Sequence, residues 1–222
     1  MLDATKTLLL ILTALFPIVN PLAGSPAFLS YTASCSSETR WRLAQKVAFN
    51  AFFVLAGSYF IGSYILKFFG ISLPVVQVGG GLIVISTGWS MLNQGSGDDR
   101  RGLYPGTPPE GVYGHAFYPL TLPLTTGPGS ISVAITLGAN AAHQRLAHFL
   151  GMAAALVASA LIAISVYLCY AFADRLAQAL GTQGMSVLQR LSSFLLVCVG
   201  VQIVWNGASS LLKSLPLPAI PL

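Results

Sequence analysis

The stretch "FPIVNPLAGSPAF", residues 16–28, decides the fold, because it places three prolines in an otherwise apolar segment. A proline inside a helix has no backbone N–H for the carbonyl four residues earlier, and it costs roughly 3 kcal/mol. Pro17, Pro21 and Pro26 therefore predict a broken or re-entrant helix rather than a continuous one. An alternative stays open, in which the prolines only kink a helix that binds nothing.

The composition around this stretch indicates a membrane protein. The 222 residues are 55% hydrophobic and 8% charged, with a mean hydropathy of +0.74, whereas soluble domains carry about 25% charged residues. A helix that crosses a bilayer needs about 20 mostly apolar residues. Six charge-free intervals reach that length, and they predict six spans in one integral membrane domain, 1–222: 7–37, 47–66, 68–97, 111–144, 146–173 and 191–212.

The proline motif occurs twice. "FPIVNPLAGSP" (16–26) aligns without a gap on "YPLTLPLTTGP" (118–128), and three prolines and one leucine match at an offset of 102 residues. A weaker repeat aligns "VVQVGGGLIVISTG" (75–88) with "VLQRLSSFLLVCVG" (187–200) at an offset of 112. Internal repetition of this kind indicates two structurally similar halves.

Each half then contains three spans. The first half is 1–97, the second is 116–222, and a linker rich in glycine, proline and charge joins them at 95–115. Because three is odd, the second half enters the membrane from the opposite side. The sequence thus predicts an all-α membrane protein with six transmembrane helices, arranged as two inverted three-helix repeats whose first and fourth helices are broken by Pro and Gly.

The two breaks form the predicted binding site. Irregular backbone at membrane depth must be buried in protein or line a wet cavity. We expect half-helices to begin at Pro26 and Pro128, capped by Ser25 and Gly127, so that their N-termini favour a carboxylate and freed carbonyls favour an ammonium group or a cation. The amides of Asn50 and Gln202 form the preferred polar pair elsewhere. The candidate residues are Pro17, Asn20, Pro21, Gly24, Ser25, Pro26, Asn50, Thr121, Pro123, Thr125, Thr126, Gly127, Pro128, Gly129 and Gln202.

Several classes of protein do not fit this sequence. The predicted spans contain no Asp or Glu, so a proton relay is disfavoured, and carbonyl-coordinated sodium, exchange or uncoupled passage remain. The chain contains neither H-E-x-x-H nor G-x-S-x-G, and no enzyme is predicted. Three cysteines without zinc spacing predict no metal or other cofactor. The net charge of +5 is dispersed, which suits anionic lipid and not nucleic acid.

The basic residues also predict the orientation. The odd-numbered connections carry seven Lys and Arg residues, against four at the termini and in the even-numbered connections. Since short cytoplasmic loops are enriched in Lys and Arg, both termini should face the periplasm.

Four stretches carry a resemblance to a known family: "NPLAGSP", "GISLPVVQVGGGLIVISTG", "YPLTLPLTTGPGSI" and "RLSSFLLVCVGVQIVWNG". Through them the chain resembles the MarC family of six-span bacterial inner-membrane proteins, which is related to the LysE-type exporter superfamily. The resemblance implies a transporter-like inverted repeat in the plasma membrane. Some relatives look like carriers of small neutral amino acids such as alanine and glycine. Many relatives have N-P-x-G, whereas here Ala23 intervenes before Gly24.

The leading hypothesis is a secondary transporter that moves a small polar or zwitterionic solute across the lipid bilayer by alternating access. Its partners would be that small-molecule substrate and the surrounding lipid, with a homo-oligomer as an open alternative. Two other functions stay open. One is efflux of antibiotic-like compounds, which the family name suggests, and the other is a membrane partner protein that transports nothing.

Overall fold

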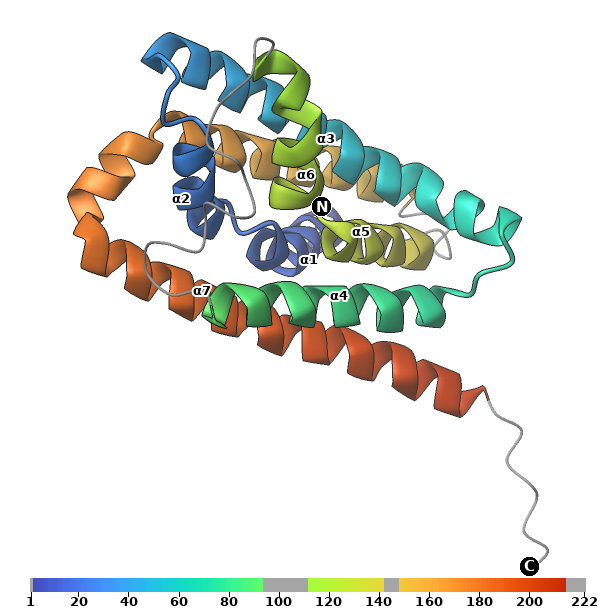
Figure 1. The fold of residues 1–222 in the computed structure, drawn as a ribbon. Helices are drawn as coiled ribbons and strands as arrows, with labels where there is room; N and C mark the ends of the chain where they lie inside the picture. Colours follow the sequence, from blue (N-terminus) through green and yellow to red (C-terminus); the bar gives the residue numbers. More distant parts are fainter. Residues whose placement is uncertain (1, 94–111, 142–147, 215–222) are drawn as a thin grey trace, which may run out of the picture.

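The computed structural model describes residues 2–93, 112–141 and 148–214, and every regular element in these ranges is helical. Most of the predicted linker 95–115 lies outside the described residues. The elements are α1 (Leu2–Val19), α2 (Pro21–Tyr31), α3 (Ser37–Phe68), α4 (Leu73–Asn93), η2 (Val112–Ala116), η3 (Phe117–Thr125), α5 (Pro128–Ala141), α6 (His148–Ala171) and α7 (Ala173–Lys213) (Figure 1).

Five helical segments are long and apolar enough to cross a membrane, and a sixth span results if a bent pair is counted as one. The bent pair joins Tyr113–Thr125 to Pro128–Ala141 at an angle of 73°. These segments match the six predicted intervals. The other five are Thr5–Tyr31, Ser37–Phe68, Leu73–Asn93, Gly151–Ala171 and Gln183–Lys213.

The last helix begins earlier than the charge-free interval 191–212 suggests. α7 starts at Ala173, and Gly181 interrupts it with a left-handed backbone (φ 64°) that glycine adopts without a steric penalty. Arg190 is exposed within the continuous part that follows. In Figure 1 the orange start of α7 accordingly runs in a different direction from its red continuation.

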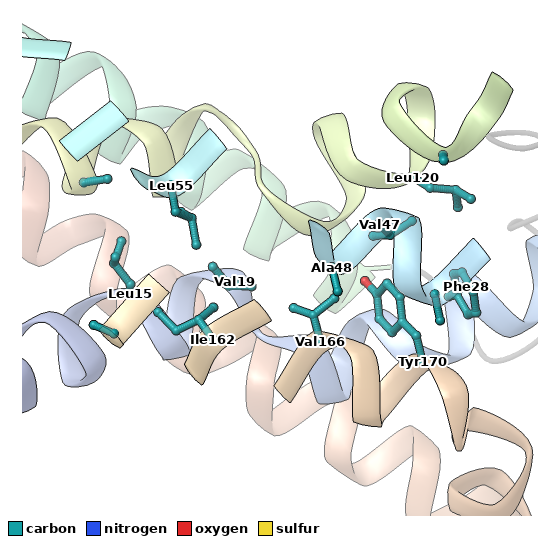
Figure 2. Packing of buried hydrophobic residues seen from close by; sticks show 14 of the residues in the cluster. Leu15, Val19, Phe28, Val47, Ala48, Leu55, Leu120, Ile162, Val166 and Tyr170 are labelled. Atoms are coloured by element: carbon teal, nitrogen blue, oxygen red, sulfur yellow. The ribbon is translucent and has the colours of Figure 1, made fainter. Parts of the chain in front are cut away.

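The core forms around α3 and α6. α3 packs on both α5 and α6, and α6 packs on α1. Apolar residues at helical spacing place one buried face of α3 against α6, as Figure 2 shows for Val47, Ala48, Leu55, Ile162 and Val166. Many large apolar side chains are instead exposed on the outer surface, as expected for helices that face lipid.

α4 and α7 lie side by side and antiparallel (Figure 1), and glycines bring their backbones close together. A methyl group on Gly81 would lie 2.9 Å from the carbonyl oxygen of Gly200, and one on Gly88 would lie 2.9 Å from that of Ser193. Small residues at such contacts let membrane helices approach without a side chain between them.

Candidate substrate-binding site

The first proline motif is interrupted at one residue, Asn20, whose left-handed backbone (φ 44°, ψ 60°) separates α1 from α2. Asparagine tolerates this conformation better than most residues. Its side-chain oxygen accepts a hydrogen bond from the N–H of Ala23 at 3.4 Å, and Pro21 takes the first helical position. The helical hydrogen bonds Asn20 N–H to Phe16 O and Gly24 N–H to Asn20 O still form, so the interruption is local.

The predicted helix start at Pro26 is therefore wrong. The helix begins at Pro21 with Asn20 as its cap, and Pro26 lies inside α2. Asn20 supplies both the unusual backbone and the capping oxygen, which leaves no capping role for Ser25. The Ser25 hydroxyl is buried instead, 2.8 Å from the carbonyl oxygen of Pro21 and 3.3 Å from that of Cys169, so it ties α2 to α6.

The second proline motif is broken more strongly. η3 is wound as a π-helix with extended backbone at Tyr118 and Leu122, and each of these residues forms a cis peptide bond with the proline that follows it. A residue before proline is driven out of the α region by the proline ring. Thr126 and Gly127 then connect η3 to α5. This helix begins at Pro128, which confirms the predicted start.

Threonines satisfy the backbone of this irregular segment. The hydroxyls of Thr121 and Thr125 donate to the carbonyls of Ala116 and Leu120 at 2.6 and 2.7 Å, and that of Thr126 donates to the carbonyl of Thr121 at 3.1 Å. All three threonines are buried. Among the described residues, every buried side-chain nitrogen or oxygen has a hydrogen-bond partner. In this conformation the threonines thus hold the break together from within.

The two motifs meet at Tyr170 of α6, which is fully buried. Its hydroxyl lies 2.9 Å from that of Thr125, and its ring stacks on Phe28 with centroids 4.4 Å apart. Gly24 lies against the same hydroxyl, since a methyl group there would be 2.6 Å from it. Figure 2 shows Tyr170 beside Phe28 at one end of the core. Sequence reasoning missed this residue, because a tyrosine in an apolar span carries no local signal of its partners.

The other predicted residues are spread more widely. Pro123 and Pro128 are exposed, Pro17 and Gly127 are partly buried, and Gly129 is buried where a side chain would overlap Val84 of α4. The contact of α2 with η3, and the contacts of both with α6, bring two groups of predicted residues together. The first group is Asn20, Pro21, Gly24 and Ser25 on α2 and its cap, and the second is Thr121, Thr125 and Thr126.

Asn50 and Gln202 do not form the expected pair. Asn50 lines an open recess of about 510 Å³ between α3 and the η2–η3 segment, where the ammonium group of Lys46 lies 4.5 Å from the ring centre of Tyr113. Gln202 lies exposed on α7, and its Nε2 donates to Oδ1 of Asn206 at 2.9 Å. Both residues were predicted because they are amides within apolar spans. Polarity does not indicate whether two residues lie on the same surface.

A charged network around the buried Arg40 links the two halves at the end where α2 meets α3. The Arg40 guanidinium donates from Nε to the Thr32 hydroxyl at 3.1 Å and from Nη2 to the Thr32 carbonyl at 3.0 Å, and its Nη1 pairs with Asp174 of α7. Arg40 is buried, and a cavity of about 200 Å³ lies beside it, lined in part by Trp41 and Arg175. No local motif indicated this pair, because its members are 134 residues apart along the chain.

The described residues form helices of membrane-spanning length, and two irregular proline segments meet inside the bundle. This arrangement defines the class of integral membrane proteins with discontinuous helices. The family model for "MarC family integral membrane protein" matches residues 5–212, and the chain is a member of the MarC family.

Relatives of similar length agree with this assignment. The chain is 31% identical over 219 residues to the inner membrane protein MarC of Escherichia coli O1:K1 / APEC, and the match covers 96% of this chain and 99% of that protein. It is 29% identical, with the same coverage, to the inner membrane protein MarC of Salmonella typhimurium strain LT2. No solved structure matches the chain.

Proposed function

We propose that this chain is a secondary transporter of the bacterial inner membrane, which moves a small polar or zwitterionic solute by alternating access. Small neutral amino acids are the first candidates. The observation that carries the proposal is the meeting of two proline-broken segments, far apart in sequence, at the buried hydroxyl of Tyr170. Discontinuous helices that meet inside a bundle are typical of transporter binding sites. The relatives' name, inner membrane protein, supports the location.

The packing of α4 against α7 supports an inverted repeat. Gly88 lies against Ser193 and Val197 of the opposite helix. The offset of 112 residues relates Gly88 of α4 to Gly200 of α7. The same offset relates Ser193 and Val197 of α7 to Gly81 and Ile85 of α4. Gly200 lies against these same two residues. Each of these contacts of α4 with α7 thus has an equivalent contact in which the two helices have exchanged roles. A two-fold axis in the membrane plane that relates the two antiparallel helices would produce this pattern.

The helix contacts support the same symmetry. If the segment from α1 to α2 corresponds to the segment from η3 to α5, then α3 corresponds to α6 and α4 to α7. At the offset of 102 residues, η3 corresponds to α1 and α5 to α2. The packing of α3 on η3 and α5 then corresponds to that of α6 on α1 and α2, and the packing of α4 on α5 corresponds to that of α7 on α2. Each half crosses over to the other, which would let the halves rock against one another around a shared site.

The chemistry of the breaks favours a small zwitterion. The N-terminus of α5 at Pro128 carries the positive end of a helix dipole and suits a carboxylate, while the backbone carbonyls of the breaks suit an ammonium group or a coupling sodium ion. Gly24 and Ser25 are both buried beside the first break. Tyr170 fills the space beside Gly24, so we expect a substrate to enter only when this side chain moves aside.

Flux in proteoliposomes tests the proposal. Radiolabelled alanine and glycine should enter vesicles containing the protein faster than empty vesicles, and a sodium gradient should reveal whether sodium drives the flux. Pro128→Ala should slow the flux because it loosens the second break. The matched control is Gly57→Ala in α3, where a methyl group meets no other atom within 4 Å. Flux equal to that of empty vesicles would contradict the proposal.

One observation favours the alternative of a membrane partner protein that transports nothing. The threonines of the second break bond within their own segment, which a purely structural kink would also produce. Accessibility separates the two functions. In a transporter, Thr125→Cys should react with a membrane-impermeant thiol reagent in a substrate-dependent way, whereas in a static partner protein it should stay unreactive under all conditions.

A further inference from the structure

The outer face of α7 carries two amides where lipid would be expected. Gln202 and Asn206 are exposed and one helical turn apart, and a single hydrogen bond of 2.9 Å joins Gln202 Nε2 to Asn206 Oδ1. Both lie in the charge-free interval 191–212, and Gln202 is at its centre. The two amides thus face outward near the middle of the predicted membrane span.

This position is unfavourable for an isolated chain in lipid. A primary amide offers two donor hydrogens and a carbonyl oxygen, so one bond between Gln202 and Asn206 leaves most of their hydrogen-bonding capacity unused. Hydrocarbon tails supply neither donors nor acceptors, and transfer of an unsatisfied amide into them costs several kcal/mol. Asparagine and glutamine on membrane helices are accordingly satisfied by neighbouring helices.

The amides belong to a continuous stripe along α7. Leu191, Leu195, Cys198, Gln202 and Asn206 follow one another at intervals of three or four residues, and all five are exposed. This spacing puts them on one face of the helix. The opposite face is the one that packs on α4, so the stripe points away from the described bundle.

We propose that this stripe, which we call the α7 outer stripe, binds the same stripe of a second copy of the chain. Amides are self-complementary, since each carries both donors and an acceptor, and a two-fold axis along the membrane normal brings Gln202 of one copy to Gln202 of the other. Leucines and Cys198 supply the apolar remainder of the interface. The proposal is independent of the transport function, because the stripe is exposed and contains no residue of either proline break.

Cys198 is a natural reporter of this interface. We would replace Cys35 with serine and Cys169 with alanine, leave Cys198 as the single cysteine, and oxidise native membranes with copper phenanthroline. A disulfide-linked dimer is expected. The control carries Leu161→Cys in a chain without other cysteines, because Leu161 is exposed at the centre of the α6 span Gly151–Ala171 but lies off α7. Cross-linking of Cys198 that does not exceed this control would overturn the proposal.

A second measurement tests the amides themselves. In the double variant Gln202→Leu/Asn206→Leu, both amides become lipid-compatible side chains of similar size, so the fold is retained. We expect the dimerisation constant, measured by energy transfer between labelled copies as they are diluted with lipid, to weaken about tenfold. Thr87→Leu on the exposed face of α4 is the matched control and should leave it unchanged. An unchanged constant in the double variant, or monomers at every dilution of the unaltered chain, would refute the interface.

Discussion

The hydroxyl group of Tyr170 lies 2.9 Å from that of Thr125, and this contact joins α6 to the second proline break. The same tyrosine lies against Gly24 of the first break, so one side chain touches both copies of the duplicated motif. A movement of either break must therefore change the contacts of Tyr170. This relationship makes the tyrosine the most informative position for mutation.

Tyr170→Phe should destabilise the protein modestly. The substitution keeps the ring that stacks on Phe28 and removes only the hydroxyl. Thr125 retains its bond to the Leu120 carbonyl, so no threonine hydroxyl is left without an acceptor, and we expect a loss of about 1 kcal/mol. Thermal unfolding in detergent measures the change. Tyr64→Phe, at a well-exposed tyrosine, is the control and should have no effect; equal melting temperatures for the two variants would contradict the assignment.

Gly24→Ala should destabilise the protein more than the addition of a single methyl group suggests. The added methyl group would lie 2.6 Å from the Tyr170 hydroxyl, closer than such atoms approach, so the tyrosine or α2 must shift. We expect a loss of roughly 1–3 kcal/mol, as in other overpacked cores. Gly57→Ala meets no neighbour and should be neutral or slightly stabilising. Combining Gly24→Ala with Tyr170→Phe should restore part of the loss, and strictly additive losses would show that the two residues do not interact.

Gly200→Ala should separate α4 from α7. Its methyl group would meet the backbone nitrogen of Ile85 at 2.8 Å, and a backbone atom cannot turn aside as a side chain can. A loss of roughly 1–3 kcal/mol is expected on unfolding in detergent. Gly79→Ala, on the open side of α4, should instead stabilise the helix by up to about 1 kcal/mol. If both substitutions have the same effect, the close helix approach is not important for stability.

Arg40→Met should destabilise far more than Arg42→Met. Arg40 is buried and bonded to Thr32 and Asp174, whereas Arg42 forms an exposed pair with Glu38 one turn away. Because Asp174 is half-exposed, solvent screens part of the buried pair, and we expect a loss of roughly 2 kcal/mol for Arg40 against less than about 0.5 kcal/mol for Arg42. The two melting temperatures in detergent measure the difference, and a larger loss for Arg42 would contradict the network.

The membrane spans could be predicted from the sequence because charge is excluded from hydrocarbon on physical grounds. The limits of α7 could not. Arg190 ended the apolar interval, but a helix continues through an arginine that remains exposed, and only Gly181 interrupts it. The helix start at Pro128 was predictable, since proline at the first helical position has a local cause.

The details of the site depended on information that local sequence does not contain. Both Asn20 and Ser25 precede a proline and can cap a helix, and the tertiary fold selected Asn20. Tyr170 is 45 residues from Thr125 in the sequence, and Asp174 is 134 residues from Arg40. Contacts over such distances follow from the packing of whole helices, so no motif at either end could indicate them.

The glycine-lined seam between α4 and α7 also has a consequence for how the two halves assemble. α4 belongs to the first half and α7 to the second, so the contact between them does not depend on a covalent link between the halves. Fragments 1–97 and 98–222, produced together in one cell as separate polypeptides, should therefore find each other in the bilayer and copurify as a heteromeric complex.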